Sequence, residues 1–190
     1  MKRIIVGISG ASGVEMGYHF LKALGNFPDI ETHLVITEGA RKTWELECDI
    51  PLTQLMELAY AIHDNKNLAA SVSSGSFVTS GMVVMPCSMK SLSGITTGYA
   101  ANLLCRAADV CLKEGRKVVL VPREMPLGKI HLRNLSTAAD LGCTIIPPLL
   151  TFYNKSNTLS QQINHINGKV LRQFGLESPD FIQWEGVQSC

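Results

Sequence analysis

The sequence predicts an α/β fold: a three-layer, doubly wound parallel sheet with helices on both of its faces. Short apolar runs rich in β-branched residues recur along the chain, none of them alternates apolar with polar residues, and amphipathic stretches separate them. A strand that reads as a continuous apolar run is covered on both faces, as strands in parallel sheets are. Strands that alternate with helices favour right-handed crossovers and a ligand site beyond the carboxyl ends of the strands.

Each element has its own support in the sequence. Strands are expected at the apolar runs, residues 4–8, 33–36, 82–85, 118–121 and 144–146. Helices are expected where apolar residues recur with helical spacing, at residues 14–24, 52–61, 99–113, 128–141 and 158–174. In the first helix, Met16, Phe20 and Leu24 form one stripe before Gly25, a typical residue after a helix end. The stretch from Asn65 to Gly81 is rich in Ser and Gly, which indicates a long loop of the kind that often carries function.

Composition limits the kind of protein. The chain has 17 Lys and Arg against 16 Asp and Glu, and a formal charge of +1 gives no electrostatic reason to bind nucleic acid or an anionic membrane. Charged residues make up only 17% of the chain, which indicates that other copies of the chain bury much of the surface, so we expect a homo-oligomer. We expect one domain at residues 1–176 and a C-terminal tail at 177–190. Phe181 and Trp184 in the tail would dock on a neighbouring subunit, unless the tail is a frayed end.

The cysteines and histidines show no metal-binding spacing. The cysteines are scattered, without a Cys-x-x-Cys pair: Cys48, Cys87, Cys105, Cys111, Cys143 and Cys190. We therefore expect reduced thiols, a cytoplasmic location and no metal site. Gly7, Ser9 and Gly10 interrupt the apolar start of the chain before it reaches the length of a signal sequence or a membrane span.

The first candidate site is the segment Ser9–Gly13, between the first strand and the first helix. Backbone N–H groups and the positive end of the helix dipole can receive an anion at this place, and Ser12 adds a hydroxyl donor. The segment matches neither a P-loop nor a G-x-G-x-x-G fingerprint. A phosphate site and a merely tight turn therefore both remain open.

The second candidate site is the turn Pro86–Leu92, which follows another expected strand. Its hydroxyl groups, Lys90 and backbone amides would suit a second anionic group or a ring carbonyl. The alternative is an ordinary helix start capped by Ser88, with Lys90 in solvent. Cys87 is interpreted as a small buried apolar residue rather than a nucleophile, because the spacing places no histidine near it.

The third candidate site is the segment from Arg116 to Pro126. Arg123 and Glu124 follow the carboxyl end of a buried strand, where charged side chains are costly unless they meet a ligand or each other. Arg123 could bind a phosphate and Glu124 could exchange a proton, or the two could form a structural ion pair. Upstream, Arg106 and Lys113 lie on one face of an expected helix, where by themselves they are interpreted as solvated.

Taken together, these segments closely resemble the UbiX-type flavin prenyltransferases, from the first strand to about Trp184. The resemblance rests on the order and spacing of short motifs: Gly10–Ser12, Ser74–Phe77, Pro86–Leu92, Arg106–Val110, Lys113–Glu114, Val121–Glu124 and Phe152–Tyr153. The chain is similar in particular to family members that accompany phenolic-acid decarboxylases. The resemblance implies a Rossmann-like or flavodoxin-like homo-oligomer, often a dodecamer, that binds FMN without a metal.

The implied reaction joins a dimethylallyl group from dimethylallyl phosphate to N5 and C6 of reduced FMN. The product, prenylated FMN, would serve a UbiD-type decarboxylase. The residues implied to hold FMN are Gly10, Ala11, Ser12, Thr37, Ser88, Met89, Lys90, Ser91 and Arg123. The residues implied to bind the prenyl phosphate, at an interface between subunits, are Arg106, Lys113, Tyr153 and Lys169, with Arg123 in the same cluster. Glu124 is implied to transfer protons, with Ser12 and Lys113 as further catalytic residues.

Three positions depart from the pattern that many relatives share. Thr37 stands in place of Ser, Ser91 in place of Thr, and Lys169 in place of Arg. Lys169 keeps the positive charge but cannot make the bidentate phosphate contact of an arginine, so we expect an effect on substrate affinity rather than on reaction type.

Two other functions fit parts of the sequence. One is an FMN-dependent decarboxylase of the peptidyl-cysteine type, although its Pro-Ala-Ser-Ala-Asn-Thr signature is absent from this chain. The other is a non-catalytic, flavin-carrying subunit of a decarboxylase complex.

Overall fold

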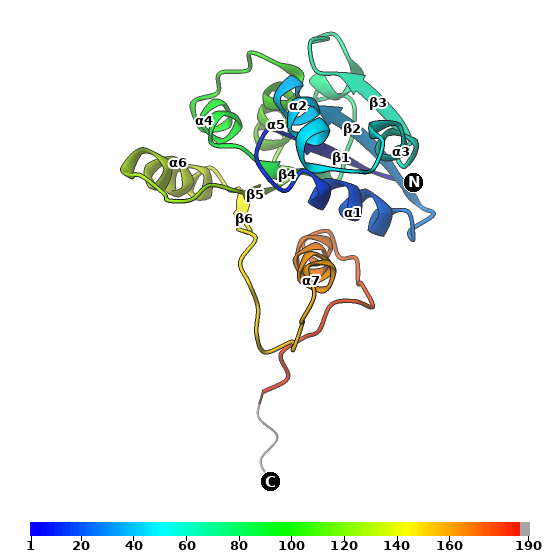
Figure 1. Cartoon of the computed structure of the whole chain (residues 1–190). Helices are drawn as coiled ribbons and strands as arrows, with labels where there is room; N and C mark the ends of the chain where they lie inside the picture. Colours follow the sequence, from blue (N-terminus) through cyan, green and yellow to red (C-terminus); the bar gives the residue numbers. More distant parts are fainter. Residues whose placement is uncertain (187–190) are drawn as a thin grey trace.

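A single parallel sheet forms the centre of the molecule. The computed structural model describes residues 1–186 and has the strand order β3-β2-β1-β4-β5-β6. The strands are β1 (Lys2–Ile8), β2 (Ile30–Ile36), β3 (Ala61–Asp64), β4 (Gly81–Cys87), β5 (Lys117–Pro122) and β6 (Thr144–Ile145). The helices are α1 (Glu15–Leu24), α2 (Glu38–Glu47), α3 (Leu52–Glu57), α4 (Met89–Thr97), α5 (Leu103–Lys113), α6 (Lys129–Asp140) and α7 (Leu159–Arg172). This order is that of a Rossmann-like doubly wound sheet, so the predicted fold class is confirmed (Figure 1).

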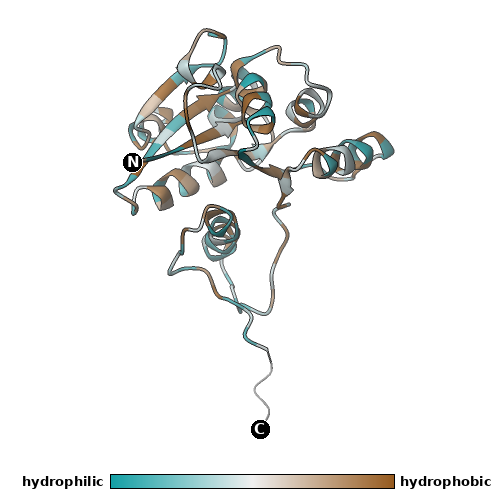
Figure 2. Cartoon of the chain, turned by 180° about the vertical axis from the view of Figure 1, so that it is seen from behind, coloured by the Kyte–Doolittle hydropathy of each residue, from teal (hydrophilic) through white to brown (hydrophobic). Residues whose placement is uncertain are grey.

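Helices cover both faces of the sheet. Ile4, Val6 and Ile8 belong to a buried cluster with α1 and α7, whereas Ile5, between them in β1, belongs to a second cluster with α4 and α5. Successive side chains of a strand point to opposite faces, and here both faces are apolar. This double burial explains why the strands read as continuous apolar runs, and Figure 2 shows the hydrophobic strands between the helices.

Two elements differ from the sequence prediction because their apolar pattern is weak. The helix expected at 52–61 ends at Glu57, and the chain then forms β3, an edge strand whose Ile62 is 42% exposed. Helix α2 was not predicted, because it buries only the side chains of Ala40 and Trp44 and therefore shows no regular apolar pattern. An edge strand or a surface helix buries few side chains, so few positions in it need to be apolar.

The helix expected at 99–113 begins later than predicted, at Leu103, and a separate helix, α4, precedes it at Met89–Thr97. Gly98, with a φ of 68°, ends α4, and the side chain of Asn102 caps α5 by accepting a hydrogen bond from the N–H of Cys105 at 2.9 Å. The left-handed conformation at Gly98 is one that a residue without Cβ adopts readily. Residues 99–101 are therefore a link between two helices, and they lie next to the candidate site described below.

The long loop predicted at 65–81 is confirmed, apart from a short 3-10 turn at Ser71–Ser73. Arginines from the neighbouring segments hold it in place. Arg116 donates hydrogen bonds to the carbonyl groups of Phe77 (2.8 Å) and Gly75, and Nε of Arg106 donates to the carbonyl of Ser73 at 3.3 Å. The loop is thus fastened to α5 and to the start of β5.

After β6 the chain leaves the sheet as an extended arm, residues 146–158, and returns as α7 (Figure 1). Leu149, Leu150 and Phe152 in this arm are 68%, 68% and 80% exposed. Residues 177–186 then run back along α7, where Arg172 donates a hydrogen bond to the side chain of Gln183 at 3.0 Å. Residues 187–190 of the expected tail, with Cys190, lie outside the described residues.

The other cysteines, between residues 1 and 186, are free thiols, as predicted. Across that same range, none of the helices combines the length and the apolar character that a membrane crossing would require.

A pair of histidines is expected to make the stability of the fold depend on pH. Nδ1 of His33 lies 3.0 Å from Nε2 of His63. Burial, and then the neighbouring imidazole, lowers the pKa of His33, and burial lowers the pKa of His63. Both pKa values therefore fall below the value of about 6.5 that the unfolded chain would have. Below pH ~6.5 the unfolded chain binds more protons than the folded one, so stability is complete above that pH and declines as the pH falls.

We expect the urea midpoint of unfolding to decrease between pH ~7 and pH ~5, and to decrease less in a His63→Gln variant, which removes one titrating group from this pair. Urea titrations at several pH values measure both quantities. An equal decrease in the wild type and the variant would contradict this role of the pair.

Candidate active site

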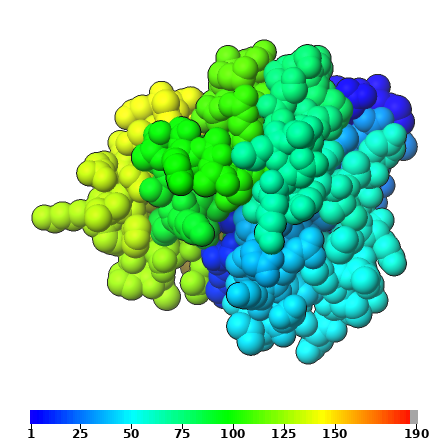
Figure 3. Space-filling view, turned by 90° about the horizontal axis from the view of Figure 1, so that it is seen from above, coloured from blue at the N-terminus to red at the C-terminus, as the bar shows by residue number. Residues whose placement is uncertain are grey.

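The candidate site lies where the direction of the sheet order reverses. The chain builds β1, β2 and β3 toward one edge, then returns to place β4 beside β1 and continues to β6 at the other edge. The loops that follow β1 and β4 therefore run toward opposite faces of the sheet, and a crevice forms between them. A cleft of about 540 Å³ opens there, and Gly10, Thr37, Ser88, Lys90 and Ser91 are among the residues that line it. Figure 3 shows α4 and α5, in green, beside the blue segments that contain the first loop and α2.

The buried hydroxyl of Ser9 fastens the loop after β1 to the turn after β4. Oγ of Ser9 donates a hydrogen bond to the carbonyl of Pro86 at 2.9 Å and accepts one from the N–H of Ser88 at 2.7 Å. The sequence analysis places Ser9 in the first candidate segment but assigns it no role. Its bonding partners lie more than 70 residues away in the chain, so no local pattern could have indicated this role.

Gly10 allows the backbone of α2 to approach the first loop. A Cβ atom at Gly10 would lie 2.8 Å from the carbonyl carbon and 2.9 Å from the Cα of Gly39. Both contacts are with backbone, which cannot rotate away as the end of a side chain could. The absence of a side chain at this position therefore sets the shape of the cleft wall.

Two helices begin at the cleft, and a hydroxyl side chain caps each of them. Oγ1 of Thr37 accepts a hydrogen bond from the N–H of Ala40 at 3.2 Å at the start of α2. Oγ of Ser88 accepts one from the N–H of Ser91, also at 3.2 Å, at the start of α4. The helix start capped by Ser88, the alternative for this turn, is therefore present, and it still leaves the positive ends of both helix dipoles at the cleft.

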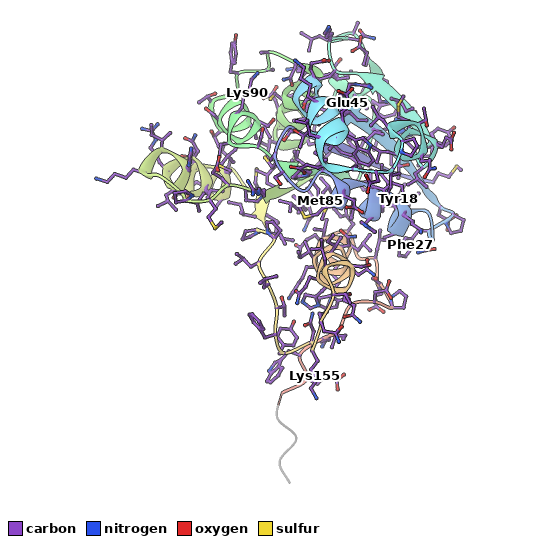
Figure 4. All side chains as sticks on the ribbon, viewed as in Figure 1. Tyr18, Phe27, Glu45, Met85, Lys90 and Lys155 are labelled. Carbon is purple, nitrogen blue, oxygen red and sulfur yellow. The ribbon has the colours of Figure 1, made fainter. Side chains whose placement is uncertain are left out.

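Lys90 adds a cationic side chain to this edge of the cleft. It is exposed in the first turn of α4, where Figure 4 labels it. Met89, also predicted to hold FMN, packs partly buried against the core beneath α4 and is absent from the residues that line the cleft.

Glu47 is a residue of this region that sequence reasoning missed. Oε2 of Glu47, at the end of α2, accepts a hydrogen bond from the N–H of Gly13 at 2.8 Å. Ala11 and Ser12 lie in the same loop and are half-buried. The two bonded groups are 34 residues apart, so only the packing of α2 beside the loop brings this carboxylate to the start of α1.

Arg123 and Glu124 lie in the turn after β5, beside the turn after β4. The N–H of Arg123 donates a hydrogen bond to the carbonyl of Cys87 at 3.1 Å, which joins the two turns. Both side chains are exposed, and the Glu124 carboxylate accepts a hydrogen bond from the N–H of Met125 at 2.9 Å. Within residues 1–186 they form no ion pair with each other, so the alternative of a structural ion pair is wrong.

Arg106 and Lys113 of α5 are engaged elsewhere in this chain. Arg106 forms an ion pair with Asp109 at 2.7 Å, and Lys113 forms one with Glu114 at 3.2 Å. Lys113 is the last residue of α5, shortly before β5 begins, so it lies near the amino ends of the strands. In a single chain the fold therefore separates Lys113 from the cleft.

Tyr153 lies in the arm and Lys169 lies on α7, and both elements are away from the cleft of the same chain (Figure 1). The hydroxyl of Tyr153 lies 3.3 Å from Nε2 of His165. Nζ of Lys169 lies 5.4 Å from the centroid of the Phe181 ring. Neither residue is among those that line the cleft.

The buried thiols are not placed for nucleophilic chemistry. Cys87 is completely buried, and burial raises the pKa of its thiol far above the ordinary range. Burial also raises the pKa of Cys105, which lines the cleft, although the charge of Lys90 acts in the opposite direction. Because the thiolate is the reactive form, these cysteines remain inert near neutral pH, in agreement with the interpretation of Cys87 as a buried apolar residue.

Comparison with known proteins identifies the family. A family model described as Flavoprotein matches residues 1–174. A probable UbiX-like flavin prenyltransferase from Sedimentibacter hydroxybenzoicus is 65% identical to this chain, over 98% of each protein. This chain belongs to the UbiX-like flavin prenyltransferases. The flavin prenyltransferase UbiX of Escherichia coli (strain K12) is 50% identical, over 98% of this chain and 100% of that protein.

Solved structures of UbiX-like proteins share the whole fold. A dodecameric, FMN-dependent UbiX-like decarboxylase from Escherichia coli O157:H7 matches with a TM-score of 0.95 and 48% identity, over 97% of this chain and 100% of its own. AnUbiX (PadA1), in complex with FMN and dimethylallyl pyrophosphate, matches with a TM-score of 0.95 and 42% identity, over 98% and 99%. As a member of this family, the chain is a flavoprotein and a prenyl-transferring enzyme.

The peptidyl-cysteine decarboxylase EpiD is a more distant neighbour of this UbiX-like protein. It matches with a TM-score of 0.60 but only 14% identity, over 79% of this chain and 90% of its own. Such a likeness is one of fold alone. The alternative of a peptidyl-cysteine type of decarboxylase therefore gains no functional support from it.

Proposed function

We propose that the protein joins the dimethylallyl group of dimethylallyl phosphate to N5 and C6 of reduced FMN, and so makes prenylated FMN for a UbiD-type decarboxylase. The observation that carries the proposal is a cleft at the carboxyl edge of the sheet, with two helix N-termini, in a flavin prenyltransferase. The relative solved with FMN and dimethylallyl pyrophosphate supports the choice of acceptor and of a dimethylallyl donor.

The residues of the cleft fit FMN in size and in charge. A volume of about 540 Å³ lies within the range of cofactor sites. The N-termini of α2 and α4, with Lys90, favour the negative charge of a phosphate monoester, and Gly10 leaves room for close approach to the backbone. Ala11, Ser12, Met89 and Arg123 remain proposed contacts beside the lining residues Gly10, Thr37, Ser88, Lys90 and Ser91.

The chain's own residues can assist the departure of the prenyl phosphate. Reduced FMN supplies the electron-rich atoms that accept the prenyl group. Breaking the allylic carbon–oxygen bond leaves the electron pair on a phosphate oxygen, and the Arg123 guanidinium can donate hydrogen bonds to that oxygen. Glu124 follows Arg123 in the chain and is exposed. Its carboxylate can accept the proton that the flavin ring loses on ring closure, or pass a proton to the departing phosphate. Ser12 and Lys113 are proposed to assist as further catalytic groups.

The remaining donor-binding residues would come from another copy of the chain. Tyr153, Lys169, Arg106 and Lys113 do not line the cleft of their own chain, and the arm that carries Tyr153 is exposed and apolar. We therefore propose a homo-oligomer in which these residues complete a neighbour's site, of dodecameric size as in the E. coli O157:H7 structure.

The proposed organisation has one flavin-binding domain, residues 1–176, and a tail, residues 177–190. The part of the tail that the structure describes packs on α7 of its own chain through Phe181 and Gln183. Contact between this tail and a neighbouring subunit is part of the proposal. The free thiols support a cytoplasmic location.

One experiment tests the reaction directly. The purified protein is mixed anaerobically with reduced FMN and dimethylallyl phosphate, and the released flavin is analysed by mass spectrometry. We expect a flavin that carries one added five-carbon unit. Unmodified flavin from a protein that binds FMN would overturn the proposal and favour a flavin-carrying subunit of a decarboxylase complex.

A charged residue in the arm tests the proposed assembly. Phe152 is 80% exposed, and an Asp at this position would place an unpaired carboxylate in a subunit interface. We expect Phe152→Asp to yield smaller particles in light scattering and to lose most prenyl transfer while it still binds FMN. Leu46→Asp, at a position on α2 that is 87% exposed, serves as the control. An assembly of wild-type size for Phe152→Asp would exclude the arm from the interface.

A further inference from the structure

His165 lies on α7 and contacts Tyr153 of the arm; Figure 4 labels Lys155, two residues further along the arm. The histidine is 4% exposed, and its Nε2 lies 3.3 Å from the Tyr153 hydroxyl. Phe181 from the tail stacks on the imidazole with ring centroids 4.8 Å apart, and Trp184 packs edge-on against Tyr153 at 5.5 Å. These contacts hold the imidazole and the phenol in one relative orientation.

The surroundings of the imidazole determine where its proton lies. Nδ1 of His165 is buried and finds no hydrogen-bond partner within residues 1–186. Burial, and then the charge of Lys169, lowers the pKa of His165, so the ring is neutral at pH 7 and carries one N–H. A proton on Nδ1 would be a buried donor without an acceptor, which is costly. The proton therefore lies on Nε2 and is donated to the Tyr153 oxygen.

This arrangement leaves the Tyr153 proton available for a ligand. A phenol oxygen that accepts a hydrogen bond from His165 keeps its own O–H free, and Tyr153 is 41% exposed. Lys169 lies one helical turn after His165, on the same side of α7, which adds a positive charge nearby. A fixed donor beside a cation suits a phosphate oxygen, because little rotational freedom is lost when the ligand binds.

We propose that His165 is a positioning residue: it holds the Tyr153 hydroxyl so that the phenol proton is donated to a phosphate oxygen of the prenyl donor. The inference rests on the proposed function, which assigns Tyr153 to the binding of that donor. His165 itself does not touch the substrate and acts only through Tyr153.

Two substitutions of His165 separate hydrogen bonding from packing. His165→Phe keeps an aromatic ring for Phe181 to stack on but has no N–H, whereas His165→Gln keeps an N–H donor and loses the ring. We expect His165→Phe to raise KM for dimethylallyl phosphate about three- to tenfold, with kcat and the Kd of FMN close to wild type. We expect His165→Gln to restore most of the affinity. A raised KM in the Gln variant together with a normal KM in the Phe variant would show a packing role and overturn the proposal.

A double-mutant cycle then tests whether His165 acts through Tyr153. Tyr153→Phe should raise KM, and adding His165→Phe to it should cause no further rise, because the hydroxyl that His165 orients is already gone. Independent effects that multiply in the double variant would contradict the proposal, as would an unchanged KM for Tyr153→Phe alone.

Calorimetric titration of dimethylallyl phosphate into enzyme with oxidised FMN should give the same pattern of Kd values without turnover. The failure of the proposed function would look different, since the wild type itself would then form no prenylated flavin.

Discussion

Replacing Glu124 by Gln is expected to lower kcat for prenyl transfer by about 100-fold or more, with the Kd of FMN unchanged. The amide has nearly the same shape as the carboxylate, and its oxygen can still accept the hydrogen bond from the N–H of Met125. It cannot take up the proton that is released on ring closure. Anaerobic single-turnover experiments, with mass spectrometry of the quenched flavin, measure the rate, and quenching of FMN fluorescence measures binding.

Glu45→Gln provides a control for the loss of one negative charge. Glu45 is exposed on α2, as Figure 4 shows, and is absent from the residues that line the cleft. We expect this variant to turn over at the wild-type rate. Unchanged turnover in Glu124→Gln would remove Glu124 from the mechanism.

The second large effect is expected from Gly10→Ala. The added methyl group would lie 2.8 Å from the carbonyl carbon of Gly39, so the start of α2 would have to move away from the loop after β1. Overpacking of this kind costs about 1–3 kcal/mol. We expect the free energy of unfolding to fall by about that amount and the Kd of FMN to rise about tenfold or more, because both walls of the cleft shift. Thermal unfolding without FMN and FMN titration measure the two effects separately.

Gly39→Ala is the matched control for stability, because it adds the same methyl group on the other side of the same contact. A Cβ atom at Gly39 would meet Cα of Gly10 at 3.5 Å, an ordinary van der Waals distance. Alanine also favours the helical conformation of α2. We expect the apo form of this variant to be at least as stable as the wild type. Equal unfolding temperatures for the two variants would show that the close approach at Gly10 is unimportant.

Much of the fold could be predicted because each pattern is local. The strands β1, β4 and β5 read as apolar runs since neighbouring residues face two buried layers, and Met16, Phe20 and Leu24 mark the buried side of α1. Two of the elements that prediction missed, α2 and β3, bury few side chains, so their sequences are weakly constrained. Helix α4 was expected only as the alternative for the turn that begins at Pro86.

Part of the candidate site could likewise be predicted from local sequence, and part could not. In a parallel sheet the loops after the strands meet at one edge, so the sequence by itself indicated that the segments around Gly10, Ser88 and Arg123 would come together. The motifs in those segments also indicated a flavin prenyltransferase, and the family comparison confirms it.

Only the tertiary structure decided which groups complete that edge. The bond from the Ser88 N–H to Ser9, the contact of Gly10 with Gly39, and the bond from Gly13 to Glu47 join residues far apart in the chain. The tertiary structure likewise placed Tyr153 against His165, away from the cleft of its own chain. Side-chain periodicity reports which face of an element is buried, whereas these contacts depend on how separate elements pack, and that information is absent from any local stretch of sequence.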